Sequence, residues 1–404
     1  MKRSGFADLP LHGGRVPSWL AERMTRLGTA IIEAVIYEHG RGEALTRLSD
    51  PFWFQALGCV MGMDWHSSGI TTSVMGALKR GLNPRAHELG IYICGGRGNH
   101  SRATPGEITQ ISEKHGLPGD ELARCSRLAA KVDNTAVQDG FQLYLHSFLL
   151  TLDGQWAIIQ QGMNTKSRLA RRYHWHSAGL RSFTNEPHAA VVGENQGVIL
   201  NLVHRDALNT QNGILQLLNE KPGYVEKEAR HLIMPRAHQV TTADVNLKRL
   251  GAVLAVAYDH EIKSFADALL ISGMGPRALQ SLALVSEVIY GTPTRFNDPA
   301  RFAFAHGGKD RRPFPVPTKI YDRTIDVLGS AIEKAKLGET DRLDGLKRLH
   351  EFTCVVEREF NPRADLEQII EMEFADSPTH GGRSVFGWEK TPSTKYSQLT
   401  LFDD

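Results

Sequence analysis

Hydrophobic residues in the first half of the chain recur with two different periods. Residues 17–48 carry apolar side chains at helical spacing, and this helix is predicted to end at Gly40. A second helix is predicted from residue 71 towards Gly81. Residues 89–94 and 198–203 are short runs rich in β-forming residues, so residues 1–205 are expected to form a mixed α/β domain.

The clearest strand signal covers residues 141–163, where two apolar runs flank the turn-forming pair Asp153-Gly154. This pattern predicts an antiparallel β-hairpin. A two-residue loop would pair His146 with Gln161. Both side chains would then share a face that becomes polar away from the turn, where Asp139 enters.

The second half of the chain has a helical pattern. Helices are expected at residues 207–218, 224–233, 243–260, 320–337, 341–359 and 365–374. The sequence therefore predicts an α+β fold, in which residues 1–205 form the candidate catalytic domain and residues 206–375 form an all-α domain. Residues 376–404 are polar and are expected to form a flexible tail.

Composition narrows the class of protein. A chain of 404 residues with 41% hydrophobic content can bury a large core. The four cysteines have no C-x-x-C spacing, which argues against a zinc ribbon and fits a reducing cytoplasm. Since no apolar run is long enough to span a membrane and the start lacks a signal-peptide pattern, we expect a cytoplasmic protein with no membrane partner. The net charge of +2 means that nucleic-acid binding would depend on local basic surfaces.

Residues 264–291 predict two short helices joined by a turn at residues 273–275. Glycine permits positive φ in such a turn, and Pro276 suits the first position of the second helix. There Arg277 adds positive charge beside unpaired amide groups, which favours a phosphate ligand. The segment resembles the helix-hairpin-helix family and departs from it at Leu279, where a small residue is usual. The matching residues are Leu269, Leu270, Gly273, Gly275 and Pro276.

The resemblance implies sequence-independent binding of a DNA backbone. Since elements of this type often act in pairs and one occurs in this sequence, it also favours a homo-oligomer. The alternative interpretation is a tight structural turn between two core helices.

Three segments concentrate basic residues. No acidic residue occurs between Asp153 and Glu186, and this stretch mixes cations with aromatic rings, as suits single-stranded or distorted DNA. A solvated basic face is the alternative. Two Gly-rich segments, residues 95–102 and 305–312, could receive phosphate on their backbone amides. The candidate DNA-binding cations of the three segments are Arg97, Arg171, Arg172, Lys309, Arg311 and Arg312.

Candidate catalytic residues lie just before and within the predicted hairpin. Hydrolysis of a phosphodiester with Mg²⁺ or Mn²⁺ needs carboxylates and neutral ligands around the ion. Asp133, Asp139 and His146 are the candidate ligands, Gln161 lies at the same strand end, and Lys131 or Lys166 could stabilise charge. The set resembles those of metal-dependent nucleases, although the second acid and lysine of the restriction-enzyme-like pattern do not follow Gln161. A hydrogen-bonded strand end is the alternative.

Two further polar groups are less specific. Asp64 and His66 precede a helix and could supply a metal ligand, although capping of that helix by Ser67 and Ser68 is the simpler interpretation. The alternate spacing of His174 and His176 suits one face of a strand, but further zinc ligands cannot be assigned.

The last residues of the chain form a short amphipathic peptide. Its sequence QLTLF resembles the pentapeptide with which bacterial replication and repair proteins bind the sliding clamp. The resemblance implies polar contacts from Gln398 and apolar anchors from Leu399, Leu401 and Phe402. A chance match or an intramolecular contact is the alternative.

Over nearly its full length the sequence is similar to the family catalogued as domain of unknown function 763. The matching runs include DWHSSGITT, GGRGNHSRATP, KVDNTAVQDGFQLYLHSF, GMGPRALQSLALVSEVIYG and FAFAHGGKDRRPFPVP. The resemblance implies a helix-hairpin-helix protein suspected of acting on DNA and carries no catalytic residues with it.

These patterns lead to three hypotheses. The first is a nucleoid-associated, metal-dependent nuclease that acts on single-stranded or distorted DNA during repair or replication. The second is a non-catalytic DNA-binding or recombination accessory protein. The third is a DNA glycosylase, which would combine the turn at Gly275 with a catalytic Asp298 or Asp310 but would leave residues 1–205 unexplained.

Overall fold

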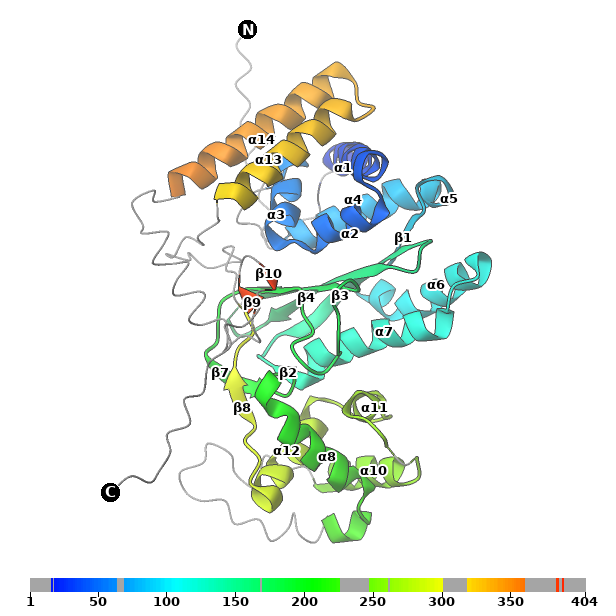
Figure 1. Cartoon of the computed structure of the whole chain (residues 1–404), viewed down its shortest axis with the longest axis vertical. Helices are drawn as coiled ribbons and strands as arrows, with labels where there is room; N and C mark the ends of the chain where they lie inside the picture. Colours follow the sequence, from blue (N-terminus) through cyan, green and yellow to red (C-terminus); the bar gives the residue numbers. More distant parts are fainter. Residues whose placement is uncertain are drawn as a thin grey trace, which may run out of the picture. The chain divides into compact units, whose positions relative to one another are not determined.

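The computed structural model describes residues 16, 18–63, 69–167, 169–225, 247–260, 262–300, 318–359, 383–384 and 387–388. The chain divides into two compact units, Met1–Phe360 and Asn361–Asp404. In the second unit, β9 (Arg383–Ser384) pairs antiparallel with β10 (Gly387–Trp388). All other elements belong to the first unit, which has a central sheet with helices on both faces (Figure 1).

The central sheet has five strands in the order β1-β3-β4-β5-β6, and every neighbouring pair is antiparallel. Its strands are β1 (Ile91–Arg97), β3 (Gln142–Thr151), β4 (Trp156–Asn164), β5 (Leu169–His176) and β6 (Ala190–Val192). β4 and β5 are buried over most of their length, because both faces of the sheet are covered. Strands in this position bury polar residues as well as apolar ones, provided that partners are supplied.

One face of the sheet is covered by helices from both ends of the unit (Figure 1). They are α1 (Ser18–His39), α2 (Arg41–Ser49), α3 (Pro51–Val60), α4 (Ile70–Leu82), α5 (Ala86–Leu89), α13 (Thr318–Lys334) and α14 (Glu339–Glu359). α1 contacts α4 and α13, and α14 contacts α3. The core of this layer joins the α3 aromatics Trp53 and Phe54 to Leu149 and Ile159 of the sheet. Asp50 starts α3 by accepting hydrogen bonds from two amides of its first turn.

The opposite face is covered by α6 (Asn99–His115) and α7 (Gly119–Lys131). A π-helical turn, η2 (Val132–Ala136), continues α7 and leads into a second sheet. That sheet has the order β2-β7-β8, from β2 (Val137–Gln138), β7 (Val198–Asn201) and β8 (Arg295–Asn297).

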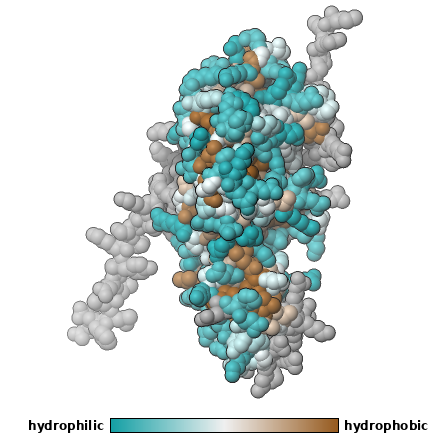
Figure 2. Space-filling model, turned by 90° about the vertical axis from the view of Figure 1, so that its right-hand side faces the viewer, coloured by the Kyte–Doolittle hydropathy of each residue, from teal (hydrophilic) through white to brown (hydrophobic). Residues whose placement is uncertain are grey.

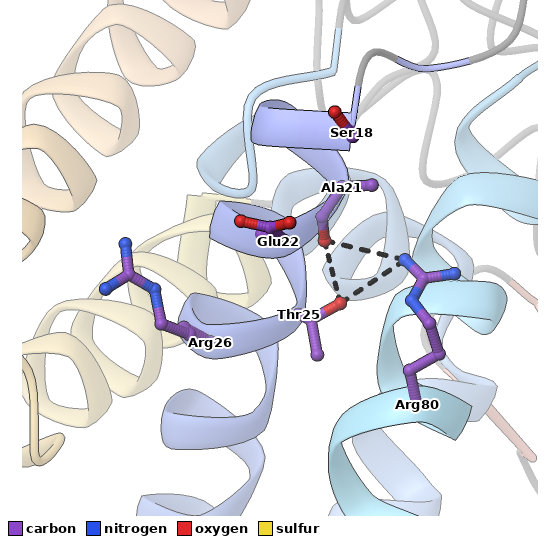
Figure 3. Close-up of a pocket in the computed structure, with 6 residues that line it drawn as sticks. All are labelled: Ser18, Ala21, Glu22, Thr25, Arg26 and Arg80. Carbon is purple, nitrogen blue, oxygen red and sulfur yellow. Dashed lines mark hydrogen bonds between the residues drawn. The ribbon is translucent and has the colours of Figure 1, made fainter.

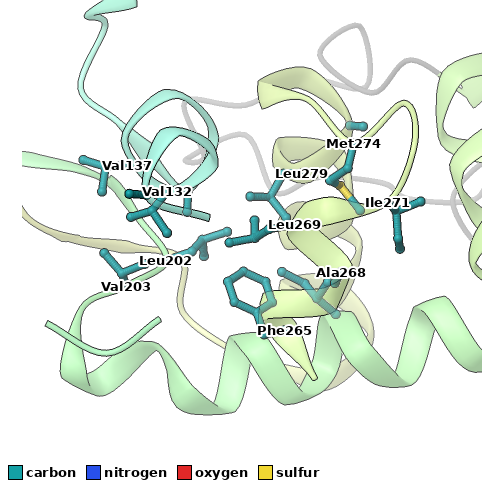
Figure 4. Close-up of a cluster of buried hydrophobic side chains, with 14 of the residues drawn as sticks. Val132, Val137, Leu202, Val203, Phe265, Ala268, Leu269, Ile271, Met274 and Leu279 are labelled. Carbon is teal, nitrogen blue, oxygen red and sulfur yellow. The ribbon is translucent and has the colours of Figure 1, made fainter. Parts of the chain in front are cut away.

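A helical layer packs beyond η2 and contains α8 (Leu208–Asn219), α10 (Leu247–Tyr258), α11 (Phe265–Leu270) and α12 (Pro276–Tyr290). Its apolar residues join η2 and the end of β7 in one hydrophobic cluster (Figure 4). Figure 2 shows a hydrophobic patch in the lower part of one face of the molecule, whereas the upper part of that face is mainly hydrophilic. α10 exposes Val256 and Tyr258 in this layer.

The mixed α+β class predicted from the sequence agrees with this structure, and so do α1, α4, α8 and α10 at their expected positions. The expected all-α character of residues 206–375 is wrong at β8, which pairs with β7. In addition, α13 packs on α1, so the compact unit runs across residue 205. The physical reason is that segments distant in sequence share one core. The spacing of hydrophobic residues along the chain is a local property and does not predict such contacts. In the described ranges, no helix is long and apolar enough to cross a membrane.

Candidate nucleic-acid interface

The segment predicted as two helices and a turn folds as α11 and α12. Ser264 starts α11, since its hydroxyl accepts a hydrogen bond from the amide of Asp267 at 3.1 Å. Gly273 has φ +82°, a conformation that glycine adopts at little cost. Pro276 occupies the start of α12, a helix of 15 residues. Gly273, Pro276 and Arg277 are exposed, so the turn and the beginning of α12 face solvent.

Two side chains from outside the segment fix the shape of this turn. Lys131 Nζ donates to the backbone oxygen of Met274 at 2.5 Å, and Gln138 Nε2 donates to that of Pro276 at 2.8 Å. Burial lowers the pKa of Lys131. Behind the turn, Met274 and Leu279 lie in the hydrophobic cluster of Figure 4. Lys131, predicted as a catalytic residue, therefore supports the turn.

Asp133, a predicted metal ligand, is completely buried in η2. Its Oδ2 accepts hydrogen bonds from Gln160 Nε2 at 2.5 Å and Trp175 Nε1 at 2.9 Å. Its Oδ1 accepts one from His188 Nε2 at 2.5 Å. Burial raises the pKa of Asp133, while the charge of His188 opposes the rise.

The prediction that His146 pairs with Gln161 is wrong by one residue. The amide of Thr151 donates to the oxygen of Gln155, which leaves three residues, 152–154, in the loop instead of two. His146 therefore lies opposite Gln160, and Gln161 lies opposite Leu145. Because successive strand residues point to opposite faces, this slip puts His146 and Gln161 on different sides of the sheet.

His146 instead extends the Asp133 network. Its Nδ1 contacts Gln160 Oε1 at 2.7 Å, and its Nε2 contacts Ser126 Oγ at 2.8 Å. Burial lowers the pKa of His146 to about 4. Hydrogen bonds therefore run without interruption from Ser126 through His146 and Gln160 to Asp133, in the layer between the sheet and α7.

Asp139 belongs to a second buried cluster. Its Oδ2 accepts hydrogen bonds from Arg171 Nη1 at 2.8 Å and from the hydroxyl of Tyr173 at 2.7 Å. Arg171 also forms a bidentate pair with Asp298, at 2.9 and 2.7 Å. Both carboxylates and the guanidinium have completely buried side chains. Asp298, the candidate of the glycosylase hypothesis, is thus an ion-pair partner in the core.

The predicted metal ligands are therefore divided between two networks. In the part of the chain that the structure describes, no group of three or more His, Cys, Asp or Glu side chains is arranged to hold a metal ion. Both oxygens of Asp133 and both of Asp139 accept hydrogen bonds from protein donors. This donor set does not fit the predicted Mg²⁺ or Mn²⁺ site, so metal-dependent chemistry stays a prediction from the sequence.

Arg171 and Arg172, predicted to bind DNA, are both 0% exposed. β5 lies between β4 and β6 with both faces covered, so its cations form no surface. Arg172 points to the face opposite Arg171 and donates to His174 Nε2 at 2.8 Å, Gln55 Oε1 at 3.1 Å and Thr71 Oγ1 at 3.3 Å. All the partners of Arg172 in the part of the chain that the structure describes are neutral groups. Burial lowers the pKa of Arg172 to about 9.

Arg97, by contrast, is exposed and lines a hollow of about 680 Å³ between α4 and the end of β1. Lys79 and Arg80 of α4 line the same hollow. Arg80 also lines a second, more open hollow of about 740 Å³ beside α1, shown in Figure 3. Lys79 and Arg80 were not predicted from the sequence as functional residues. The adjacent pair of cations was the available signal, but only the packing of α4 beside β1 turns it towards Arg97.

The remaining predicted residues lie outside the described residues. They are Asp64, His66, Lys309, Asp310, Arg311, Arg312, Gln398, Leu399, Leu401 and Phe402.

The fold and these sites define an α+β protein with an exposed, supported turn between α11 and α12 and a cationic hollow on the α4 side of its central sheet. The chain belongs to the family described as protein of unknown function (DUF763), whose model matches residues 5–316. No curated protein and no solved structure matches the sequence.

Proposed function

We propose that this protein binds the sugar-phosphate backbone of DNA through the turn between α11 and α12. The observation that carries the proposal is the exposed turn at Gly273, followed directly by the exposed start of α12 and held in place by Lys131 and Gln138. A binding site of this kind needs a rigid backbone, since amide groups bind a phosphate only when they are already oriented.

The chemistry at the start of α12 favours an anion. The first amide bonded within the helix is that of Leu279, which donates to the oxygen of Gly275. The amides of Arg277 and Ala278 precede it at the positive end of the helix dipole, and the Arg277 side chain adds a full charge. These groups recognise phosphate oxygens and not base edges, so the proposed binding is independent of DNA sequence.

The test is fluorescence anisotropy with labelled single-stranded, duplex and bubble DNA over a range of salt concentrations. Arg277→Ala should weaken binding and lower the salt dependence, log Kd against log salt, by about 0.9 on duplex, the effect of one lost phosphate contact. The matched control is Arg323→Ala, which removes an exposed arginine from α13. Equal affinities and salt slopes for Arg277→Ala and Arg323→Ala would overturn the proposal.

Metal-dependent hydrolysis of the bound DNA stays a prediction. The protein donors on Asp133 and Asp139 favour the alternative of a non-catalytic DNA-binding protein. Incubation of labelled DNA with the protein, with and without Mn²⁺ or Mg²⁺, separates the two. Cleavage that depends on the metal would support a nuclease, and binding without cleavage would support the alternative.

Binding to a bacterial sliding clamp and assembly into a homo-oligomer also stay predictions. A chain that lacks residues 398–402 should no longer co-purify with the clamp, and unchanged co-purification would contradict the motif. Light scattering with and without DNA measures the number of chains in solution.

A further inference from the structure

The hollow between α4 and β1 has an unusual charge. Its lining includes Lys79, Arg80, Arg97 and His100, with the amide of Asn83 and the hydroxyl of Ser147 as neutral polar groups. None of the residues that line it is acidic. A volume of about 680 Å³ is ample for a phosphate group with an attached sugar.

Two of the cations are not neutralised by neighbours. Lys79 Nζ pairs with Glu107 at 2.7 Å, which offsets one charge. Arg80 donates to the oxygen of Ala21 at 3.5 Å and to Thr25 Oγ1 at 3.3 Å, as Figure 3 shows. The guanidinium of Arg97 lies 5.9 Å from the centre of the Tyr144 ring. Within the described residues, neither Arg80 nor Arg97 has a carboxylate partner, so both charges remain available to an anion.

The backbone at the end of β1 allows a ligand to approach closely. Gly96 and Gly98 have φ of +138° and +63°, and a side chain at Gly98 would meet no atom within 4 Å. Gly98 is also the residue before α6, a helix of 17 residues without a side-chain cap. His100, in the first turn of α6, lines the hollow, so the positive end of this helix dipole lies beside it.

The sheet beneath the hollow adds a further positive charge. Arg97, Leu145, Gln161 and Arg172 are register partners across four neighbouring strands, so they form one row on this face of the sheet. The row ends in Arg172, a buried guanidinium whose described partners are neutral. With strands about 5 Å apart, this buried charge lies two strands from the Leu145 wall of the hollow and adds to its positive field.

We propose that the hollow lined by Lys79, Arg80, Arg97 and His100 is a binding pocket for a phosphate group of a nucleic acid. The pocket lies on the α4 side of the central sheet, whereas the turn between α11 and α12 packs beyond η2 on the other side. It is thus a second site, and its existence does not depend on DNA binding by the turn. The phosphate is either a terminal monoester or an internal diester of a strand that also passes the second hollow at Arg80.

The experiment measures binding of inorganic phosphate by calorimetry, and binding of single-stranded oligonucleotides with a 5′-phosphate or a 5′-hydroxyl by anisotropy of a 3′ label. Arg97→Ala and His100→Ala alter exposed side chains, so the fold is kept, and thermal unfolding checks this. Arg323→Ala on α13 is the charge-matched control. Arg277→Ala alters the separate site proposed at the start of α12, so combining it with Arg97→Ala should leave the loss caused by Arg97→Ala unchanged.

We expect phosphate binding to the pocket to fall about tenfold in Arg97→Ala and to be unchanged in Arg323→Ala. If the loss is larger for the 5′-phosphorylated strand, the pocket binds a terminal phosphate, and equal losses for both strands identify an internal diester. The proposal is overturned if the unaltered protein binds neither phosphate nor oligonucleotide, or if Arg323→Ala loses as much affinity as Arg97→Ala. If Arg97→Ala weakens binding and Arg277→Ala does not, the role proposed for the turn is refuted and the pocket stands.

Discussion

Acidification should destabilise this protein through one buried histidine, His146. Its Nδ1 donates to Gln160 Oε1, because the amide group of Gln160 is already a donor to Asp133. Its Nε2 is then the acceptor for the Ser126 hydroxyl, which fixes a neutral imidazole in one tautomer. A proton on Nε2 would place a positive charge in a layer where water is excluded.

The size of the effect follows from the pKa. Burial lowers the pKa of His146 to about 4 in the folded protein, against an ordinary value of 6.5. Between these two pH values His146 binds a proton in the unfolded chain but not in the folded protein. The contribution of His146 to the free energy of unfolding is therefore complete above pH 6.5 and is lost as the pH falls to 4. Since one pKa unit corresponds to about 1.4 kcal/mol, the loss amounts to about 3 kcal/mol.

Urea unfolding, followed by tryptophan fluorescence at several pH values from 7 to 4, measures this loss. Burial raises the pKa values of Asp133 and Asp139, so these two groups have the opposite pH dependence to His146. Their contribution to the free energy of unfolding is lost as the pH rises above about 3.8. The comparison of unaltered protein with His146→Gln isolates the histidine. The variant should lose about 3 kcal/mol less on acidification, whereas His87→Gln, at an exposed site of α5, should behave as the unaltered protein. Parallel pH profiles for the unaltered protein and His146→Gln would refute the buried neutral imidazole.

Three further outcomes are expected. Arg171→Met should reduce the free energy of unfolding by about 3–5 kcal/mol in urea, because it leaves two buried carboxylates without their cation. Gly95→Ala should cost roughly 2–3 kcal/mol in the same assay, since its φ is +82° and a Cβ would lie 2.3 Å from a backbone oxygen of β3. Gly98→Ala, which meets open space, should cost only about 1 kcal/mol. Burial raises the pKa of Cys94 to about 12, so iodoacetamide at pH 8 should label Cys354 well before Cys94 in a mass-spectrometric time course of the folded protein.

Local patterns predicted the parts of this fold that local interactions determine. The helix before Gly40 and the helix before Gly81 have clear apolar periods, and both form close to their expected bounds. Ser264 and Pro276 begin α11 and α12 as their chemistry requires. In these segments the same residues set the local conformation and the buried face, so the sequence contains enough information.

The hairpin marks the limit of such inference. Asp153-Gly154 indicated a turn correctly, but the loop takes in residue 152 as well, and a register shift occurs near Tyr144. Neither feature has a signal in composition, and each moves side chains between faces. The partners of the predicted acids were also out of reach. His188 lies 55 residues from Asp133, and Asp298 lies 127 residues from Arg171.

The two arginines of β5 explain why the basic stretch was misinterpreted and where an anion is accepted. Adjacent strand positions point to opposite faces, so Arg171 and Arg172 enter different environments. Arg171 has two carboxylate partners, which closes its side of the sheet to a further anion. Arg172 has neutral described partners, on the side where Arg97, Lys79 and Arg80 surround an open hollow. The number of cations in a stretch of sequence does not distinguish the two arginines. In the sheet, their side chains lie on opposite faces. On the side of the hollow, Arg80, Arg97 and Arg172 have no carboxylate partner among the described residues, so this is the side on which we propose that a phosphate binds.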